Sequence, residues 1–298
     1  MPLSLSRGCG EDEGVAHFLA HDGTRLAYRE DGGAGEGGPL LCLPGGPMRA
    51  SAYLGDLGGL SAHRRLVLLD LRGTGGSEAP ADPASYRCDR QVDDVEALRA
   101  HLGLDRIDLL THSAGGDLAI LYAARYPRRV RTLTLVAARA RALGVDFTPE
   151  QRREAAALRT DEPWFEDAYE AYLRIWDGSA TDADFDAGTP FFYGNRTAAA
   201  RAHAAAEVAQ SNDEAADAYA SEGAFADPAG TRAAVAGLDA RVLVLAGELD
   251  GGPLPRVAAT VAGLFPHAET VVQPGAGHFP WVDDPDRFAG TVATFLSR

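Results

Sequence analysis

The chain has 298 residues, 46% of them hydrophobic, and a formal net charge of −15. That composition is ordinary for a globular protein, while the acidity argues against a nucleic-acid partner, because nucleic-acid phosphates require a basic surface. The three cysteines, Cys9, Cys42 and Cys88, have neither metal-ligand spacing nor the even number of a disulfide framework, so we expect a reducing compartment.

No stretch of the sequence approaches the roughly 20 apolar residues that a membrane span needs. The first residues, MPLSLSRGCGEDEG, lack a basic start followed by a long apolar run, so no signal peptide is expected. These features predict a cytoplasmic protein without a membrane partner. They leave the oligomeric state open.

The first part of the chain alternates short apolar runs with helical patterns. Residues 24–31 alternate between apolar and polar side chains and predict an exposed strand. Two continuous apolar runs that end in glycine, 39–46 and 65–73, are typical of strands buried on both faces. Residues 91–104 have the apolar spacing of a helix that stops at Gly103.

The same alternation continues to the end of the chain, with one interruption. Further strands are predicted in 106–113, 130–138, 241–250 and 269–278, and further helices in 114–127, 255–265 and 284–296. Strands that alternate with helices predict an α/β fold with a mostly parallel, doubly wound sheet.

The interruption is the segment 145–237, which is rich in alanine, charge and aromatic residues and has no strand pattern. It holds 18 carboxylates against 7 arginines, a net charge of −11. We therefore predict an α/β core formed by 1–144 and 238–298, with a helical insert over 145–237.

The stretch THSAGG, residues 111–116, places Ser113 between a buried strand and a helix. This context is that of a nucleophile elbow, a strained turn that exposes a serine hydroxyl above the sheet. A helix starting at Ala114 would direct N–H groups and the positive end of its dipole at a developing oxyanion. Thr111 departs from the usual G-x-S-x-G pattern. The alternative is that Ser113 only caps the helix.

A nucleophilic serine needs a general base and a carboxylate that orients it. Asp250 ends the segment 241–250, just before the loop GGPLP, and His278 lies in the glycine-rich loop that ends the segment 269–278. The order serine, acid, histidine is the chain order found in such enzymes. The alternatives are a turn-forming aspartate and an exposed loop histidine. His112 is a poor base for Ser113, because neighbouring residues of a strand point to opposite faces.

These motifs resemble those of the α/β-hydrolase superfamily and, within it, the proline iminopeptidases, over nearly the whole chain. The segment LPGGPM is similar to the oxyanion loop H-G-G-P-G of that family, with Pro44 and Met48 as departures. DLRGTGGS is similar to the family segment D-x-R-G-x-G-x-S, in which we expect Arg72 to be a buried structural residue.

The resemblance implies a role for each of these residues. Ser113 would be the nucleophile, His278 the base and Asp250 the residue that orients it. The oxyanion would be held by the backbone N–H groups of Gly46 and Ala114. Gly45 would belong to the substrate-binding loop.

The resemblance further implies that the insert 145–237 is a cap whose carboxylates hold the free amine of a substrate. An ammonium group moved from water into a partly dry cleft needs such compensating charge. The candidates are Glu207, Glu214 and Glu222; the first two would share one face if this segment were a continuous helix. A solvated acidic surface explains the charge of the insert equally well.

The sequence therefore predicts a serine hydrolase that needs no metal and no cofactor. Its most specific form is an aminopeptidase that removes a small N-terminal aminoacyl group, such as proline or alanine, from a short peptide or natural-product amide through an acyl-enzyme. One alternative is an esterase, lactonase or thioesterase with the same three residues. The other is a binding protein on this fold that encloses a small molecule without turning it over.

Overall fold

The computed structural model describes residues 14–33 and 37–298, so Cys9 and most of the N-terminal segment considered above lie outside the described residues. Within these ranges, no helix combines the length and the apolar character needed to cross a bilayer. Cys42 and Cys88 are both buried free thiols.

An eight-stranded sheet forms the centre of the molecule, in the order β1-β2-β4-β3-β5-β6-β7-β8. β2 runs antiparallel to β1 and β4, and all other pairs are parallel. The predicted mostly parallel sheet is confirmed, with β1 as an additional edge strand. The strands are β1 (Val15–Leu19), β2 (Arg25–Asp31), β3 (Leu40–Leu43), β4 (Leu66–Leu69), β5 (Ile107–His112), β6 (Val130–Val136), β7 (Arg241–Gly247) and β8 (Ala268–Gln273).

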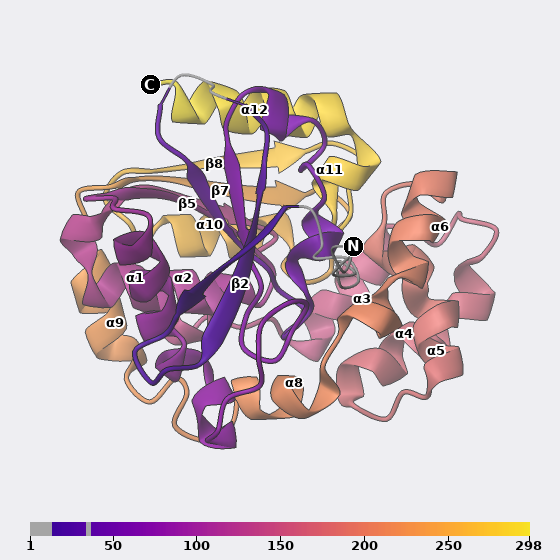
Figure 1. Ribbon diagram of the computed structural model, residues 1–298. Helices are drawn as coiled ribbons and strands as arrows, with labels where there is room; N and C mark the ends of the chain where they lie inside the picture. The colour runs from indigo at the N-terminus through magenta and orange to yellow at the C-terminus, as the bar shows by residue number, and fades with distance from the viewer. Residues whose placement is uncertain (1–13, 34–36) are drawn as a thin grey trace, which may run out of the picture.

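Helices cover both faces of this sheet (Figure 1). On one face, α1 (Val92–His101), α2 (Gly115–Arg125) and α10 (Pro255–Ala262) bury the larger apolar core. On the other face, α11 (Pro280–Asp283) and α12 (Pro285–Leu296) complete a second core with the 3-10 helices η1 (Ser51–Leu54) and η2 (Leu60–Ala62). Every residue of β3 and β4 is buried, which agrees with the continuous apolar sequences of strands covered on both faces.

The segment between β6 and β7 is helical, and its helix starts have clear chemical causes. Thr148 and Thr181 form capping boxes with the third helical residue, and Asn212 and Asp227 accept backbone N–H groups at two further starts. The helices are α3 (Pro149–Ala157), α4 (Phe165–Asp177), α5 (Asp182–Gly188), η7 (Thr189–Phe192), α6 (Ala198–Ala205), α7 (Glu207–Gln210), α8 (Asp213–Tyr219) and α9 (Pro228–Val235).

This insert has two parts that differ in what they pack against. Helices α3 to α6 gather to one side of the sheet (Figure 1), and α4 and η7 share a small core of their own around Trp164, Tyr172 and Phe191. Tyr219 of α8 and Val235 of α9 instead belong to the larger core of the sheet. The predicted boundary at residue 237 therefore places in the insert two helices that pack on the α/β core.

Arg72, in the loop after β4, is fully buried and holds two carboxylates. Its guanidinium donates two hydrogen bonds of 2.5 Å to Asp94 on α1 and one of 2.5 Å to Asp22. Burial disfavours the charge on Arg72, but the bonds to Asp94 and Asp22 outweigh burial and raise the pKa of Arg72. The structural role predicted for Arg72 is confirmed.

We expect Arg72→Leu to lower the free energy of unfolding by about 3–5 kcal/mol, because it leaves the carboxylate of Asp94 buried and unpaired. The control is Arg25→Leu, which removes an exposed ion pair with Glu78 at 4.0 Å and should cost less than about 1 kcal/mol. Urea denaturation measures both variants. Equal losses would show that Asp94 does not depend on Arg72.

Candidate functional site

The backbone makes a sharp turn at Ser113, between the end of β5 and the start of α2. Ser113 has a φ angle of 51°, which a residue with a side chain rarely adopts. Its N–H donates to Val136 on β6 and its carbonyl accepts the N–H of Gly116. These bonds hold a conformation that costs about 1–3 kcal/mol, and they give the strained strand-to-helix turn that the sequence predicts.

The turn is so tight that two neighbouring glycines cannot carry a side chain. A Cβ atom at Gly45 would lie 2.6 Å from the carbonyl oxygen of His112 and 2.8 Å from Cβ of Ser113. A Cβ atom at Gly115 would lie 2.5 Å from Oγ1 of Thr111. Thr111 is therefore tolerated in place of the usual glycine because position 115 leaves room for it.

The structure brings Ser113, His278 and Asp250 together, although they are far apart in the sequence. His278 Nδ1 lies 3.0 Å from Asp250 Oδ2, and His278 Nε2 lies 2.9 Å from Ser113 Oγ. A carboxylate can only accept, so Nδ1 carries the proton and Nε2 is free to accept the proton of the serine hydroxyl. All three residues are buried, which strengthens the hydrogen bonds between them.

The loop after β3 lies directly over the serine. Gly45 donates its N–H to the hydroxyl of Tyr53 at 2.7 Å, so this group is already used. Within the residues that the structure describes, the N–H groups of Gly46 and Ala114 donate to no protein acceptor. These are the two backbone donors implied for an oxyanion. Met48 has a φ angle of 58°, which explains why glycine is usual at this place in similar loops.

The three predicted carboxylates are all exposed to solvent. Glu207 lies 3.7 Å from Arg49, with 53% of its side chain exposed, while Glu214 and Glu222 are exposed. No hydrogen bond or ion pair between described residues joins any of them to Ser113 or His278. The condition under which Glu207 and Glu214 would share one helix face, a continuous helix, is not met, because α7 ends at Gln210 and α8 begins only at Asp213.

The break between α7 and α8 attaches the insert to the loop after β3. Ser211 forms an isolated antiparallel bridge with Arg49. On either side of it, the N–H of Ala50 donates to the carbonyl of Gln210 at 2.8 Å, and the N–H of Asn212 donates to that of Met48 at 3.1 Å. The extended conformation at Ser211 thus serves a contact with residues far away in the sequence.

Arg49 reinforces this attachment from a buried position. It is 2% exposed, and its guanidinium donates to Gln210 Oε1 at 2.9 Å and to the carbonyl of His203 at 3.0 Å. It also lies 4.6 Å from the ring centre of Tyr53. Neither Arg49 nor Tyr53 stands out in the sequence, because each acts through partners that only the fold brings near.

Two arginines pack on aromatic rings that border the Asp250 loop, where a Cβ atom at Gly252 would lie 3.0 Å from Trp176 and 3.4 Å from Phe147. Arg139 donates its backbone N–H to the carbonyl of Ser113 at 2.9 Å, and its guanidinium lies 4.6 Å from the ring centre of Phe147. Arg152 lies 4.2 Å from the ring centre of Trp176. Burial lowers the pKa of both arginines. The guanidinium of Arg139 is also paired with Asp146 at 3.0 Å.

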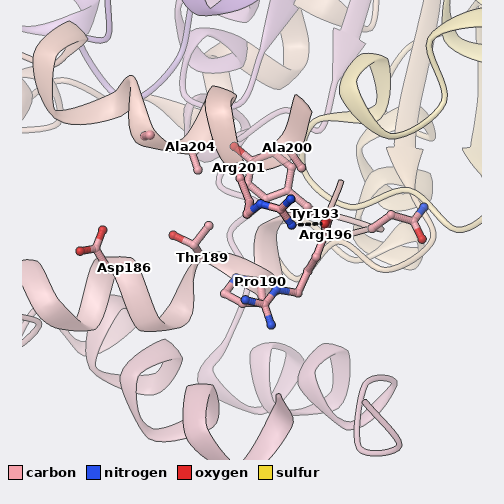
Figure 2. A pocket seen from close by; sticks show the side chains of 10 residues that line it. Asp186, Thr189, Pro190, Tyr193, Arg196, Ala200, Arg201 and Ala204 are labelled. Atoms are coloured by element: carbon pink, nitrogen blue, oxygen red, sulfur yellow. Dashed lines mark hydrogen bonds between the residues drawn. The ribbon is translucent and has the colours of Figure 1, made fainter. Parts of the chain in front are cut away.

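A separate cavity of about 240 Å³ opens in the insert, between η7 and α6 (Figure 2). Its lining includes Asp186, Arg196 and Arg201, and Arg201 donates a hydrogen bond to the carbonyl of Arg196. None of Ser113, His278 and Asp250 lines it. Among the described residues, no group of three or more histidine, cysteine or acidic side chains could hold a metal ion.

A family model described as the alpha/beta hydrolase fold matches residues 38–285, which hold strands β3 to β8 and helices α1 to α11. The chain belongs to the α/β-hydrolase family. This α/β-hydrolase is 26% identical to an esterase from Rhodococcus sp. ECU1013, with 95% of this chain and 98% of that chain covered and a TM-score of 0.68. The proline iminopeptidase of Mycobacterium smegmatis has the same fold, with 23% identity, coverage of 95% and 98%, and a TM-score of 0.71.

Curated relatives of this α/β-hydrolase carry several activities in their names. A proline iminopeptidase of Heyndrickxia coagulans is 33% identical over 39% of this chain, which spans only 40% of that relative. A putative 2-succinyl-6-hydroxy-2,4-cyclohexadiene-1-carboxylate synthase of Bacillus subtilis is 25% identical over 95% of this chain and 99% of its own length. The family model therefore establishes the family, and the names of the relatives leave several reactions open.

We expect Arg49→Met to lower the free energy of unfolding by about 1.5–3 kcal/mol, because it removes charge-assisted hydrogen bonds to Gln210 and His203. Glu207→Gln is the matched control. It removes the exposed carboxylate partner of the same guanidinium and should cost less than about 1 kcal/mol. Chemical denaturation measures both, and a larger loss in Glu207→Gln would contradict the role assigned to Arg49.

Proposed function

We propose that this α/β-hydrolase cleaves a carboxylic ester or amide through an acyl-enzyme formed on Ser113. The observation that carries the proposal is the pair of short contacts at His278, which lies 2.9 Å from Ser113 Oγ and 3.0 Å from Asp250 Oδ2. A serine, a base and an orienting carboxylate in this geometry are the parts of a nucleophilic relay, whatever their order in the chain.

In this proposal each residue has a defined part in the reaction. Ser113 Oγ attacks the substrate carbonyl while His278 Nε2 takes the hydroxyl proton. Asp250 accepts the hydrogen bond from Nδ1–H and stabilises the imidazolium that forms. The N–H groups of Gly46 and Ala114 donate to the negative oxygen of the tetrahedral intermediate. His278 then protonates the leaving group, and water, activated by the same histidine, releases the acyl group.

We expect a fluorophosphonate probe to label the wild-type protein at Ser113, and Ser113→Ala to abolish labelling. Hydrolysis of a short-chain aryl ester should fall by at least about 10³-fold, because the nucleophile is lost while the oxyanion donors remain. Ser221→Ala, at an exposed serine of the insert, is the control and should behave like wild type.

Mass spectrometry of the labelled peptide identifies the modified residue. Labelling of Ser113→Ala at the wild-type level would place the nucleophile elsewhere. A wild-type protein that stays unlabelled would instead favour the alternative in which this fold binds a small molecule without turning it over.

A second candidate is the more specific aminopeptidase, which removes a small N-terminal aminoacyl group from a short peptide or natural-product amide with a free amine. It is supported by the relatives named proline iminopeptidase, which are 33% and 37% identical over about two-fifths of this chain. The exposed positions of Glu207, Glu214 and Glu222 give it no further support. An esterase or lactonase activity is favoured by the named esterase that aligns over 95% of this chain.

A matched substrate pair separates the two candidates. If the free amine is recognised, prolyl and alanyl naphthylamides should be hydrolysed at least about tenfold faster, in kcat/KM, than their N-acetylated forms, because each lost charged contact in the site weakens the transition state. Fluorescence of the released naphthylamine measures both. Equal rates, or rapid turnover of simple aryl esters alone, would contradict the aminopeptidase candidate and support the esterase.

A further inference from the structure

A continuous chain of buried hydrogen bonds joins the loop after β3 to the His278 loop. The N–H of Gly45 donates to the hydroxyl oxygen of Tyr53 at 2.7 Å. That hydroxyl lies 2.9 Å from Nδ1 of His112, and Nε2 of His112 lies 2.8 Å from the carbonyl oxygen of His278. Tyr53 is 4% exposed and His112 is 2% exposed, so solvent does not compete for these bonds.

The two ends of this chain fix the position of every proton along it. The carbonyl of His278 can only accept, so His112 carries its proton on Nε2 and presents a bare Nδ1. The N–H of Gly45 can only donate, so the Tyr53 hydroxyl accepts it and donates its own proton to Nδ1. Burial, together with the nearby His278 ring, holds the pKa of His112 well below its usual range. His112 therefore stays neutral, as this arrangement requires.

We infer that Tyr53 and His112 are positioning residues that set the spacing between the oxyanion loop and the base His278. The inference rests on the function proposed above. The peptide held by Tyr53 is that of Gly45, directly before the implied donor Gly46. The backbone held by His112 is that of His278 itself. One chain of hydrogen bonds therefore links the backbone next to the implied oxyanion donor Gly46 to the backbone of the base His278.

Close packing holds the rings of Tyr53 and His112 in place. The ring of His112 lies 4.7 Å from the ring of His278 and 4.8 Å from that of Trp281, measured between centroids. The guanidinium of Arg49, which is tied to the insert, covers the ring of Tyr53. Because catalysis requires the reacting groups to be aligned, a shift of about 1 Å in either loop can cost on the order of 10²-fold in rate.

The test compares Tyr53→Phe and His112→Leu with the wild type in the rate of fluorophosphonate labelling and in ester hydrolysis. We expect kcat and the labelling rate constant to fall by about 10- to 100-fold, with KM changed by less than about twofold, because substrate binding itself is not touched. His112→Gln, whose amide offers both an acceptor and a donor, should recover part of the loss.

Tyr122→Phe is the matched control. Tyr122 is also fully buried and donates one hydrogen bond, to Glu96 on α1, away from both loops. It should lower the melting temperature about as much as Tyr53→Phe while leaving the labelling rate within about twofold of wild type. If both tyrosine variants lose rate only in proportion to their loss of folded protein, Tyr53 is merely structural and the inference is overturned.

Nitrogen NMR of the histidine rings checks the same arrangement without any substrate. The signals of His112 should show the neutral ring with its proton on Nε2, unchanged between about pH 5 and 8, and Tyr53→Phe should shift the signal of the bare Nδ1. A protonated ring, or a proton on Nδ1, would overturn the inference. A wild-type protein that the probe does not label would overturn the proposed function as well, which separates the two failures.

Discussion

The arrangement around the serine depends on one strained backbone position. Ser113 keeps a φ angle of 51°, and this is possible because both of its backbone hydrogen-bonding groups are held: its N–H by β6, and its carbonyl by the N–H groups of Gly116 and Arg139. These backbone hydrogen bonds offset the strain of about 1–3 kcal/mol at Ser113. The close approach of Gly45 follows from the same turn, since no side chain fits there. A change in this turn would therefore move the hydroxyl and both implied oxyanion donors together.

The insert takes part in this geometry instead of simply lying over it. Tyr219 donates to the carbonyl of Ala114 at 3.0 Å, next to the serine. Asp283 accepts the N–H groups of Gly194 in the insert and Gly277 beside His278, at 2.9 and 2.8 Å. Arg49 ties the oxyanion loop to the same insert. The turn at Ser113, the His278 loop and the oxyanion loop are thus each tied to the insert by hydrogen bonds. Removal of the insert would therefore disturb the alignment of the site as well as the access of water to it.

Local patterns predicted much of this structure, and non-local contacts account for what they missed. The apolar runs of β3, β4 and β7 and the helical spacing of α1 were sufficient, because a strand buried on both faces leaves a continuous local signal. Ser113, Asp250 and His278 could be chosen because each follows a strand, and parallel strands end at one edge. The break at Ser211 could not be predicted, since it depends on a bridge to Arg49. Tyr53 gave no signal for the same reason: its partner His112 is 59 residues away.

The acidity of the insert illustrates how far composition can be separated from a site. Asp184 and Asp227 use their carboxylates to cap helices, and Asp146 and Glu154 pair with Arg139 and Arg256. These helix caps and ion pairs, together with carboxylates on exposed faces, account for negative charge that the sequence alone could have assigned to binding a substrate amine. Arg139 reaches Ser113 only through its backbone N–H, and its guanidinium is paired with Asp146 at 3.0 Å. The net charge of the insert is therefore the sum of local ion pairs, helix caps and exposed carboxylates, and it does not by itself mark a binding site for an amine.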